Sequence, residues 1–85
     1  MTRFIAEIDI MPLDALLDPQ GKAVLTGLAA LHLNHVNDVR VGKHIRLRLE
    51  AADRAEAEAL TAKACRELLA NLVMESYVFR VHEDQ

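Results

Sequence analysis

The chain has 85 residues, enough for one domain, and we expect a single domain over residues 1–85. A chain of this length buries only about 60–65% of its unfolded surface, so its core needs a supplement. One cysteine excludes an internal disulfide, which leaves self-association as the common supplement. The net charge of −3 disfavours nucleic acid and anionic membranes as partners.

The apolar side chains must pack almost without aromatic rings. Hydrophobic residues make up 52% of the sequence, yet there are only two Phe, one Tyr and no Trp. Aliphatic residues and alanines of this kind suit helices laid on a sheet. The sequence starts directly with a strand pattern rather than a signal peptide, and no apolar run approaches the roughly 20 residues that span a bilayer. We therefore expect a cytoplasmic protein.

Residues 3–11 predict the first strand. Phe4, Ile8 and Ile10 alternate with two acidic residues, which is typical of a half-buried strand. Pro12 ends this strand, and a connector follows it.

The first helix is predicted from Pro19 to about Leu31. Asp18 is a good N-cap because its carboxylate accepts from free N–H groups of the first turn, and Pro19 suits the first helical position. Gly21 does not fit this pattern, because a glycine there costs roughly 0.5–1 kcal/mol relative to alanine. We expect some group to approach the backbone closely at Gly21.

One face of this first helix carries an apolar stripe. The stripe consists of Val24, Leu28 and Leu31, and Leu25 widens it.

The middle segment, residues 36–50, allows two readings. A hairpin with a two-residue loop at Gly42 and Lys43 would pair Val41 with His44, an apolar residue with a charged or polar one. The apolar residues instead occupy odd positions throughout, as one continuous strand requires. We favour a long strand that bends at Gly42, and a hairpin with a three-residue loop stays open. Such a strand overhangs a small sheet, so we expect it to pair with a second copy of the chain.

The second helix is predicted over residues 54–71. Asp53 is its N-cap, and Glu56 stands three residues later, as in a capping box. The predicted inner stripe consists of Ala57, Leu60, Ala64 and Leu68, with Cys65 as a further candidate.

Residues 75–82 predict the last strand. Tyr77, Phe79 and Val81 share one face of it, and Val78 points to the other.

Three motifs together resemble one family. The first is LDPQGKA at residues 17–23, the second is VRVGK at residues 39–43, and the third is LLAN at residues 68–71, followed by VME and Tyr77. In this order and at this spacing they resemble the PurS family, the small subunit of phosphoribosylformylglycinamidine synthase. The resemblance covers residues 4–81.

The resemblance implies a fold and a function. The fold would be an α+β two-layer sandwich, β-α-β(-β)-α-β, with an antiparallel sheet related to the ferredoxin-like fold and a long bent middle strand completed by a second subunit. The assembled ligase converts formylglycinamide ribonucleotide, glutamine and ATP to formylglycinamidine ribonucleotide in purine biosynthesis. The small subunit would bridge the glutaminase and the large synthase subunit, as a homodimer or tetramer. It would hold no catalytic residue, metal or cofactor, since the large subunit binds ATP and Mg²⁺.

The family motifs point to residues at a subunit interface. These are Asp18, Gln20, Gly21, Arg40, Gly42 and Lys43. The residues themselves leave a second interpretation open. The helix start around Gly21 could be a tight loop-to-helix junction, and the basic residues could be solvated charges on a strand. Arg46 and Arg48 are expected to be solvated charges on the outer face of a strand, balanced by Asp38 and Glu50.

The chain departs from the family pattern at three places. The connector at residues 11–15 lacks the usual glycine and is about two residues longer. His32 stands where a glycine usually ends the first helix, at a position that favours positive φ. Leu72 stands where the family often has proline.

Other functions are weaker alternatives. A small dimeric regulatory domain that binds an amino acid or other metabolite between subunits has the same size and build. An acylphosphatase-like enzyme would need an arginine in a glycine-rich loop after the first strand, and none is there. Cys65 is expected in the core, and His32 with His35 lacks a third metal ligand. His44 and His82 are expected to be exposed strand residues.

Overall fold

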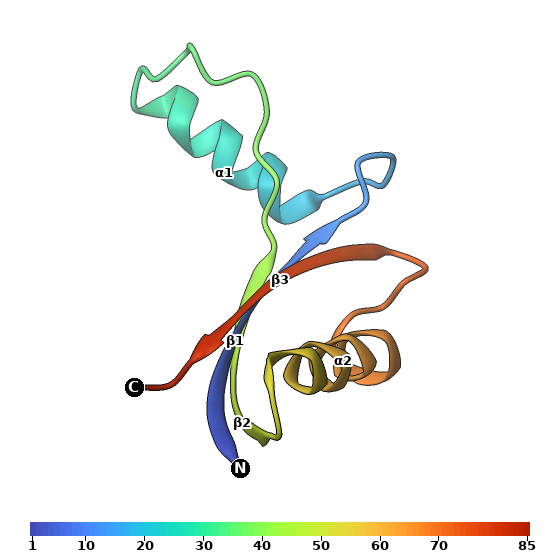
Figure 1. Ribbon diagram of the computed structural model, residues 1–85. Coiled ribbons are helices and arrows are strands. Elements are labelled where there is room, and N and C mark those ends of the chain that lie inside the picture. Colours follow the sequence, from blue (N-terminus) through green and yellow to red (C-terminus); the bar gives the residue numbers. More distant parts are fainter.

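The computed structural model describes all residues, Met1–Gln85, as an α+β fold (Figure 1). A three-stranded antiparallel sheet has the order β2-β1-β3, and one helix packs against it. The elements in chain order are β1 (Thr2–Pro12), α1 (Pro19–Ala30), β2 (Lys43–Ala51), α2 (Arg54–Ala64), the π-helical turn η1 (Cys65–Leu69) and β3 (Glu75–Glu83). The predicted α+β class and antiparallel sheet are confirmed, with three strands in the chain.

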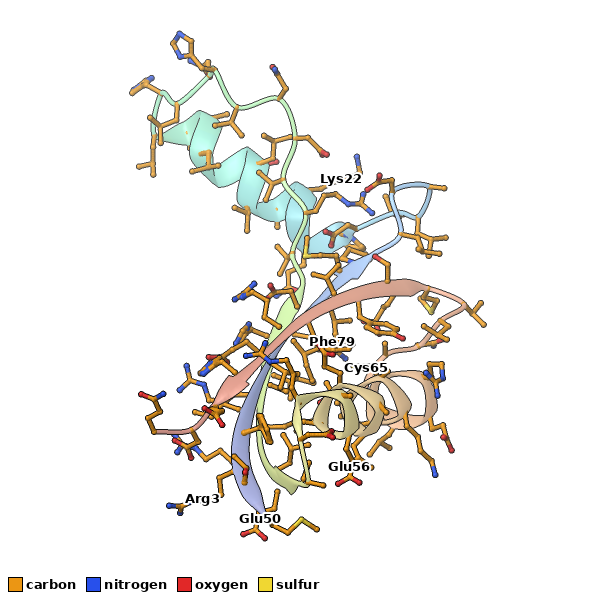
Figure 2. All side chains as sticks on the ribbon, viewed as in Figure 1. Arg3, Lys22, Glu50, Glu56, Cys65 and Phe79 are labelled. Carbon is orange, nitrogen blue, oxygen red and sulfur yellow. The ribbon has the colours of Figure 1, made fainter.

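The sheet has one apolar face and one polar face. Phe4, Ala6, Ile8 and Ile10 of the central strand β1 are all buried on the face that α2 covers. In Figure 2 the side chains of Cys65 and Phe79 lie between α2 and the sheet. The alternation predicted for β1 is therefore confirmed.

Strand β3 also follows its prediction. It begins at Glu75 and ends one residue beyond the predicted end. Val81 is buried, Tyr77 and Phe79 are half-buried on the same face, and Val78 is 65% exposed on the other. This strand pairs with β1 from Phe4↔Glu83 to Pro12↔Glu75.

Helix α2 begins at the predicted cap. The Asp53 carboxylate accepts from the Glu56 N–H at 2.8 Å, and the Glu56 side chain accepts from the Ala52 N–H at 2.9 Å. The reciprocal bond goes to the residue before the cap, so this is a variant of the capping box.

The predicted inner stripe of α2 is partly wrong. Ala57 and Cys65 are buried as expected, but Leu60 is 45% exposed and Leu68 is 82% exposed. Thr61 takes the inner position because it lies one helical turn from both buried residues. Its hydroxyl donates to the Ala57 carbonyl at 2.8 Å, which satisfies the polar atom inside the core.

The end of this helix also differs from its prediction. The last turn, η1, widens to π geometry, and the Ala70 N–H donates to the Cys65 carbonyl at 3.0 Å. Helical structure therefore ends at Leu69, two residues before the predicted end. The wider turn brings Ala70 into the core, where it is 7% exposed.

We call α1 and residues 31–42 the arm, and the sheet with α2 and η1 the body. The arm projects from one end of the body (Figure 1). The radius of gyration is 16.5 Å, whereas a compact 85-residue domain has about 12 Å. The expectation that both helices lie on the sheet is therefore wrong for α1.

The apolar stripe of α1 has no sheet beneath it. Leu25 and Leu28 are half-buried, but Val24 is 44% exposed and Leu31 is 68% exposed. Figure 2 shows side chains around α1 with no layer of the body facing them. The spacing of the apolar residues predicted the stripe. The spacing does not tell whether the same chain or another chain packs against the stripe.

His32 ends α1 with a positive φ of 65°. Its N–H donates to the Ala29 carbonyl, and the Leu33 N–H donates to the Leu28 carbonyl. These two bonds form a Schellman motif, in which His32 takes the left-handed position that glycine usually occupies.

The middle segment forms one strand, and no hairpin is present. Strand β2 begins at Lys43 and pairs with β1 from Ile10↔Lys43 to Thr2↔Ala51. Residues 36–42 have no strand partner within the chain, so the part of the predicted long strand before Lys43 stays a prediction that depends on a second copy.

No helix of the structure combines the length and apolar character needed to cross a membrane.

Candidate functional site

The first two sequence motifs meet at the base of the arm. The Asp18 carboxylate accepts from the Gly21 N–H at 3.0 Å through one oxygen and from the Val41 N–H at 2.8 Å through the other. Asp18 is only 8% exposed. A single buried carboxylate therefore joins the start of α1 to the segment that returns from it. We call Asp18, Gly21, Arg40, Val41 and Gly42 the clasp.

The clasp holds Asp18 in its ionised form. The backbone N–H groups of Val41 and Gly21 stabilise the carboxylate and lower its pKa below the usual 3.8, although burial opposes this. The positive charge of Arg40 lowers the pKa further. Hydrogen bonds to the charged form thus outweigh the cost of removing it from water.

Gly21 is explained by an approach from the same chain. A Cβ at this position would collide with the Val39 carbonyl oxygen and lie 2.6 Å from an Asp18 carboxylate oxygen. The expected close approach is confirmed, and the approaching group is the returning segment itself. The structural interpretation of a tight loop-to-helix junction therefore accounts for this glycine.

Gly42 has the same role on the other side of the clasp. A Cβ there would collide with the Ile10 carbonyl oxygen and with the sulfur of Met11. The chain passes this close to the end of β1 just before β2 begins. Gly42 thus marks the point where the arm joins the sheet, and it does not reverse the chain.

Arg40 ties the connector after β1 to the clasp. Its guanidinium donates to the Leu13 carbonyl at 2.7 Å and to the Leu16 carbonyl at 3.0 Å. These bonds tie the connector to the returning segment. Arg40 is half-buried, so the prediction that the basic residues are simply solvated does not hold for it.

Gln20 and Lys43 face outward. Gln20 is exposed, and the Lys43 ammonium lies 3.7 Å from the Glu75 carboxylate in an exposed pair that contributes little to stability. Of the six residues predicted for an interface, the structure therefore brings Asp18, Gly21, Arg40 and Gly42 into contacts within the chain. An additional interface role for the six residues stays a prediction.

The sequence reading missed an ionic cluster on the polar face of the sheet. His44 contacts both Glu7 and Asp9, and Arg46 contacts Glu7 at 2.9 Å. Arg48 lies 3.6 Å from Asp84. The alternating acids of the first strand were visible in the sequence, but only the strand register places them opposite these bases.

The pKa of Glu7 falls from 4.5 to about 2 in this cluster. The hydrogen bond from Arg46 is the largest cause, and the hydrogen bond from His44 follows. The same carboxylate raises the pKa of Arg46. Glu7 is therefore ionised at neutral pH.

No candidate metal centre is found among the side chains. No three or more His, Cys, Asp or Glu residues gather so that they could hold a metal ion. Cys65 is buried as predicted, and burial raises the pKa of its thiol above 9.0, which makes the thiolate scarce. The two surface hollows, of about 330 and 340 Å³, are open to solvent.

Comparisons with known proteins agree with one another. A family profile described as phosphoribosylformylglycinamidine (FGAM) synthase, PurS, matches residues 5–83. The phosphoribosylformylglycinamidine synthase subunit PurS of Bacillus subtilis is 43% identical over 70 residues, which are 82% of each chain.

Solved structures show the same fold. Thermus thermophilus PurS is 41% identical, with 98% of this chain and 99% of that chain covered and a TM-score of 0.82. A chain in the structure of PurLQS from Thermotoga maritima is 34% identical, with 99% and 100% covered and a TM-score of 0.85.

Proposed function

The chain belongs to the PurS family and is the small subunit of phosphoribosylformylglycinamidine synthase, a ligase of purine biosynthesis, and from this premise we propose how it acts. It is an assembly subunit that bridges the glutaminase and the large synthase subunit in the cytoplasm. The glutaminase releases ammonia from glutamine. The large subunit binds ATP and Mg²⁺ and activates the amide oxygen of formylglycinamide ribonucleotide, which ammonia replaces. The chain itself supplies no catalytic residue and no cofactor.

The arm is the observation that carries this proposal. Its apolar side chains remain exposed at the end of α1 and beyond: Leu31 by 68%, Leu33 by 49% and Val36 by 38%. The body does not reach them (Figure 1). Burying this surface requires another chain, which supports a function in contact rather than in catalysis.

We propose that a second copy of the chain covers the arm. No backbone N–H of residues 34–40 donates a hydrogen bond within the chain. After the turn at residues 34 and 35, residues 36–40 lead back from the tip of the arm toward β2 (Figure 1). Unpaired backbone groups next to exposed apolar side chains are a template for pairing with another strand. The small core of this body makes such a supplement valuable. The copy would therefore complete the middle strand.

Sedimentation of a concentration series tests self-association. We expect a dimer or a larger assembly for the native chain and a shift toward monomer for Leu33→Asp, which places a charge on the arm. Leu68→Asp is the matched control, since Leu68 is an exposed leucine of the body. A folded native monomer at all concentrations contradicts the proposal. If Leu68→Asp dissociates the assembly and Leu33→Asp does not, the interface lies on the body and not on the arm.

Co-purification tests the bridging role. The tagged chain, supplied with glutamine and ADP, should recover both the large synthase subunit and the glutaminase. Recovery of neither partner contradicts the proposed role, even if the chain is a dimer. A monomeric Leu33→Asp chain that still recovers both would separate self-association from bridging.

A further inference from the structure

His44 contacts two carboxylates with its two ring nitrogens. Nδ1 lies 2.6 Å from an Asp9 carboxylate oxygen, and Nε2 lies 3.0 Å from a Glu7 carboxylate oxygen. Asp9 is the direct partner of His44 in the β1–β2 register, and Glu7 lies two residues along β1 on the same face. The imidazole therefore spans two residues of the neighbouring strand.

Only the imidazolium satisfies both contacts. A neutral imidazole has one N–H donor, so its second nitrogen would present a lone pair to an anionic oxygen. The protonated ring donates to both carboxylates. These carboxylates raise the pKa of His44 above 6.5, with Asp9 as the larger cause and Glu7 as the next.

The other charged groups around the cluster each contact one carboxylate. Arg46 of β2 donates to Glu7 at 2.9 Å, and Arg80 of β3 lies 3.9 Å from Asp9. No helix covers this face of the sheet. His44 is thus the one side chain that joins Glu7 to Asp9.

The cluster lies where the arm leaves the sheet. Asp9↔His44 and Ile10↔Lys43 are the last two pairs of the β1–β2 ladder. Gly42 follows at once toward the arm and passes close to the Ile10 carbonyl. A contact that holds His44 against β1 therefore also limits fraying at the root of the clasp.

We propose that His44 is a proton-controlled clamp, in which the imidazolium bonds to Glu7 and Asp9 hold the end of the β1–β2 ladder and thereby the root of the arm. The clamp is complete when the ring is protonated and loses one of its two bonds when the ring is neutral. Because the folded-state pKa of His44 is raised, the contribution is full below pH 6.5 as long as Glu7 stays ionised, and it is lost as the pH rises through the folded-state pKa. The arm therefore loosens on the alkaline side.

Proton NMR titration of the full chain tests the protonation state. We expect a His44 midpoint above 6.5, which Asp9→Asn lowers. Glu50→Gln is the matched control: Glu50 is exposed on the same strand, and its partner in the register is Arg3. A native midpoint at or below 6.5, or an equal effect of the two substitutions, overturns the clamp.

Hydrogen exchange tests the link to the arm. After correction for intrinsic exchange, we expect the protection of the Val41 amide to fall as the pH passes the His44 midpoint. In His44→Gln, protection should be low and independent of pH in that range. An identical pH dependence in both chains overturns the proposal, whatever their oligomeric state. If His44→Gln does not fold, the native profile decides, because protection that does not change through the midpoint contradicts the clamp.

Discussion

The body and the arm are held in place by different forces. The body contains every buried apolar side chain, in two clusters around Ala6 and Ile8 between the sheet and α2. At the junction with the arm, the buried residues are a carboxylate and a glycine, Asp18 and Gly21. The body is stabilised by apolar burial, while the arm is positioned by hydrogen bonds and close backbone packing at its base. The arm can therefore expose apolar side chains while the core of the body stays packed.

Truncation in the body should have the largest effect. Ile8 is fully buried at the centre of the sheet, so Ile8→Ala should lower the free energy of unfolding by roughly 2–5 kcal/mol. Urea denaturation followed by circular dichroism measures this. A loss below that of a typical surface substitution would contradict the assignment of the core to the body.

Adding one methyl group to the clasp should have the next largest effect. The Cβ of Gly21→Ala collides with the Val39 carbonyl, so we expect a loss of about 1–3 kcal/mol. Gly27→Ala is the matched control in the same helix, where a Cβ meets nothing within 4 Å. That substitution should stabilise the chain by about 0.5–1 kcal/mol. Equal effects in thermal unfolding would contradict the close approach at Gly21.

The two N-cap carboxylates differ in their partners: Asp53 caps only its own helix, whereas Asp18 also accepts from Val41. Asp53→Ala removes a cap within one element, and we expect a loss of roughly 0.5–2 kcal/mol. Asp18→Ala also releases the Val41 amide from the clasp. Hydrogen exchange at Val41 should accelerate in Asp18→Ala and stay unchanged in Asp53→Ala. Acceleration in neither variant would show that the clasp does not hold the arm.

The smallest expected effect is on the dependence of stability on acidic pH. Substitutions of Glu7 and Asp18 should change this dependence over different pH ranges. Both carboxylates have lowered pKa values, so their contributions are present at neutral pH and are lost as the pH falls. For Glu7 the loss runs between pH 4.5 and about 2. In Glu7→Gln the unfolding midpoint should change less with pH over that range than in the native chain. An equal change with pH in both chains would contradict the ionic cluster. In Asp18→Asn the unfolding midpoint should change less with pH only from pH 3.8 downward.

The parts of the fold that depend on local chemistry were predictable. Both helix caps, the faces of β1 and β3, and the odd nature of Gly21 follow from neighbouring residues and from the period of the side chains. The inner stripe of α2 was predicted only in part, at Ala57 and Cys65. The sequence pattern did not show that Thr61 is buried, because its hydroxyl bonds to a backbone carbonyl of the same helix. The clasp itself joins positions more than twenty residues apart, and the motifs indicated both halves without the contact between them.

The sequence by itself determined the family, the strands and helices, and the positions where a side chain does not fit. These follow from short-range sterics, capping and the alternation of apolar residues. The tertiary structure alone decided that α1 leaves the sheet, that residues 36–42 have no strand partner within the chain, and that His44 faces two acids. Those outcomes depend on the register between strands and on close contacts between distant segments. In such contacts a carbonyl or a carboxylate approaches a residue far away in the sequence.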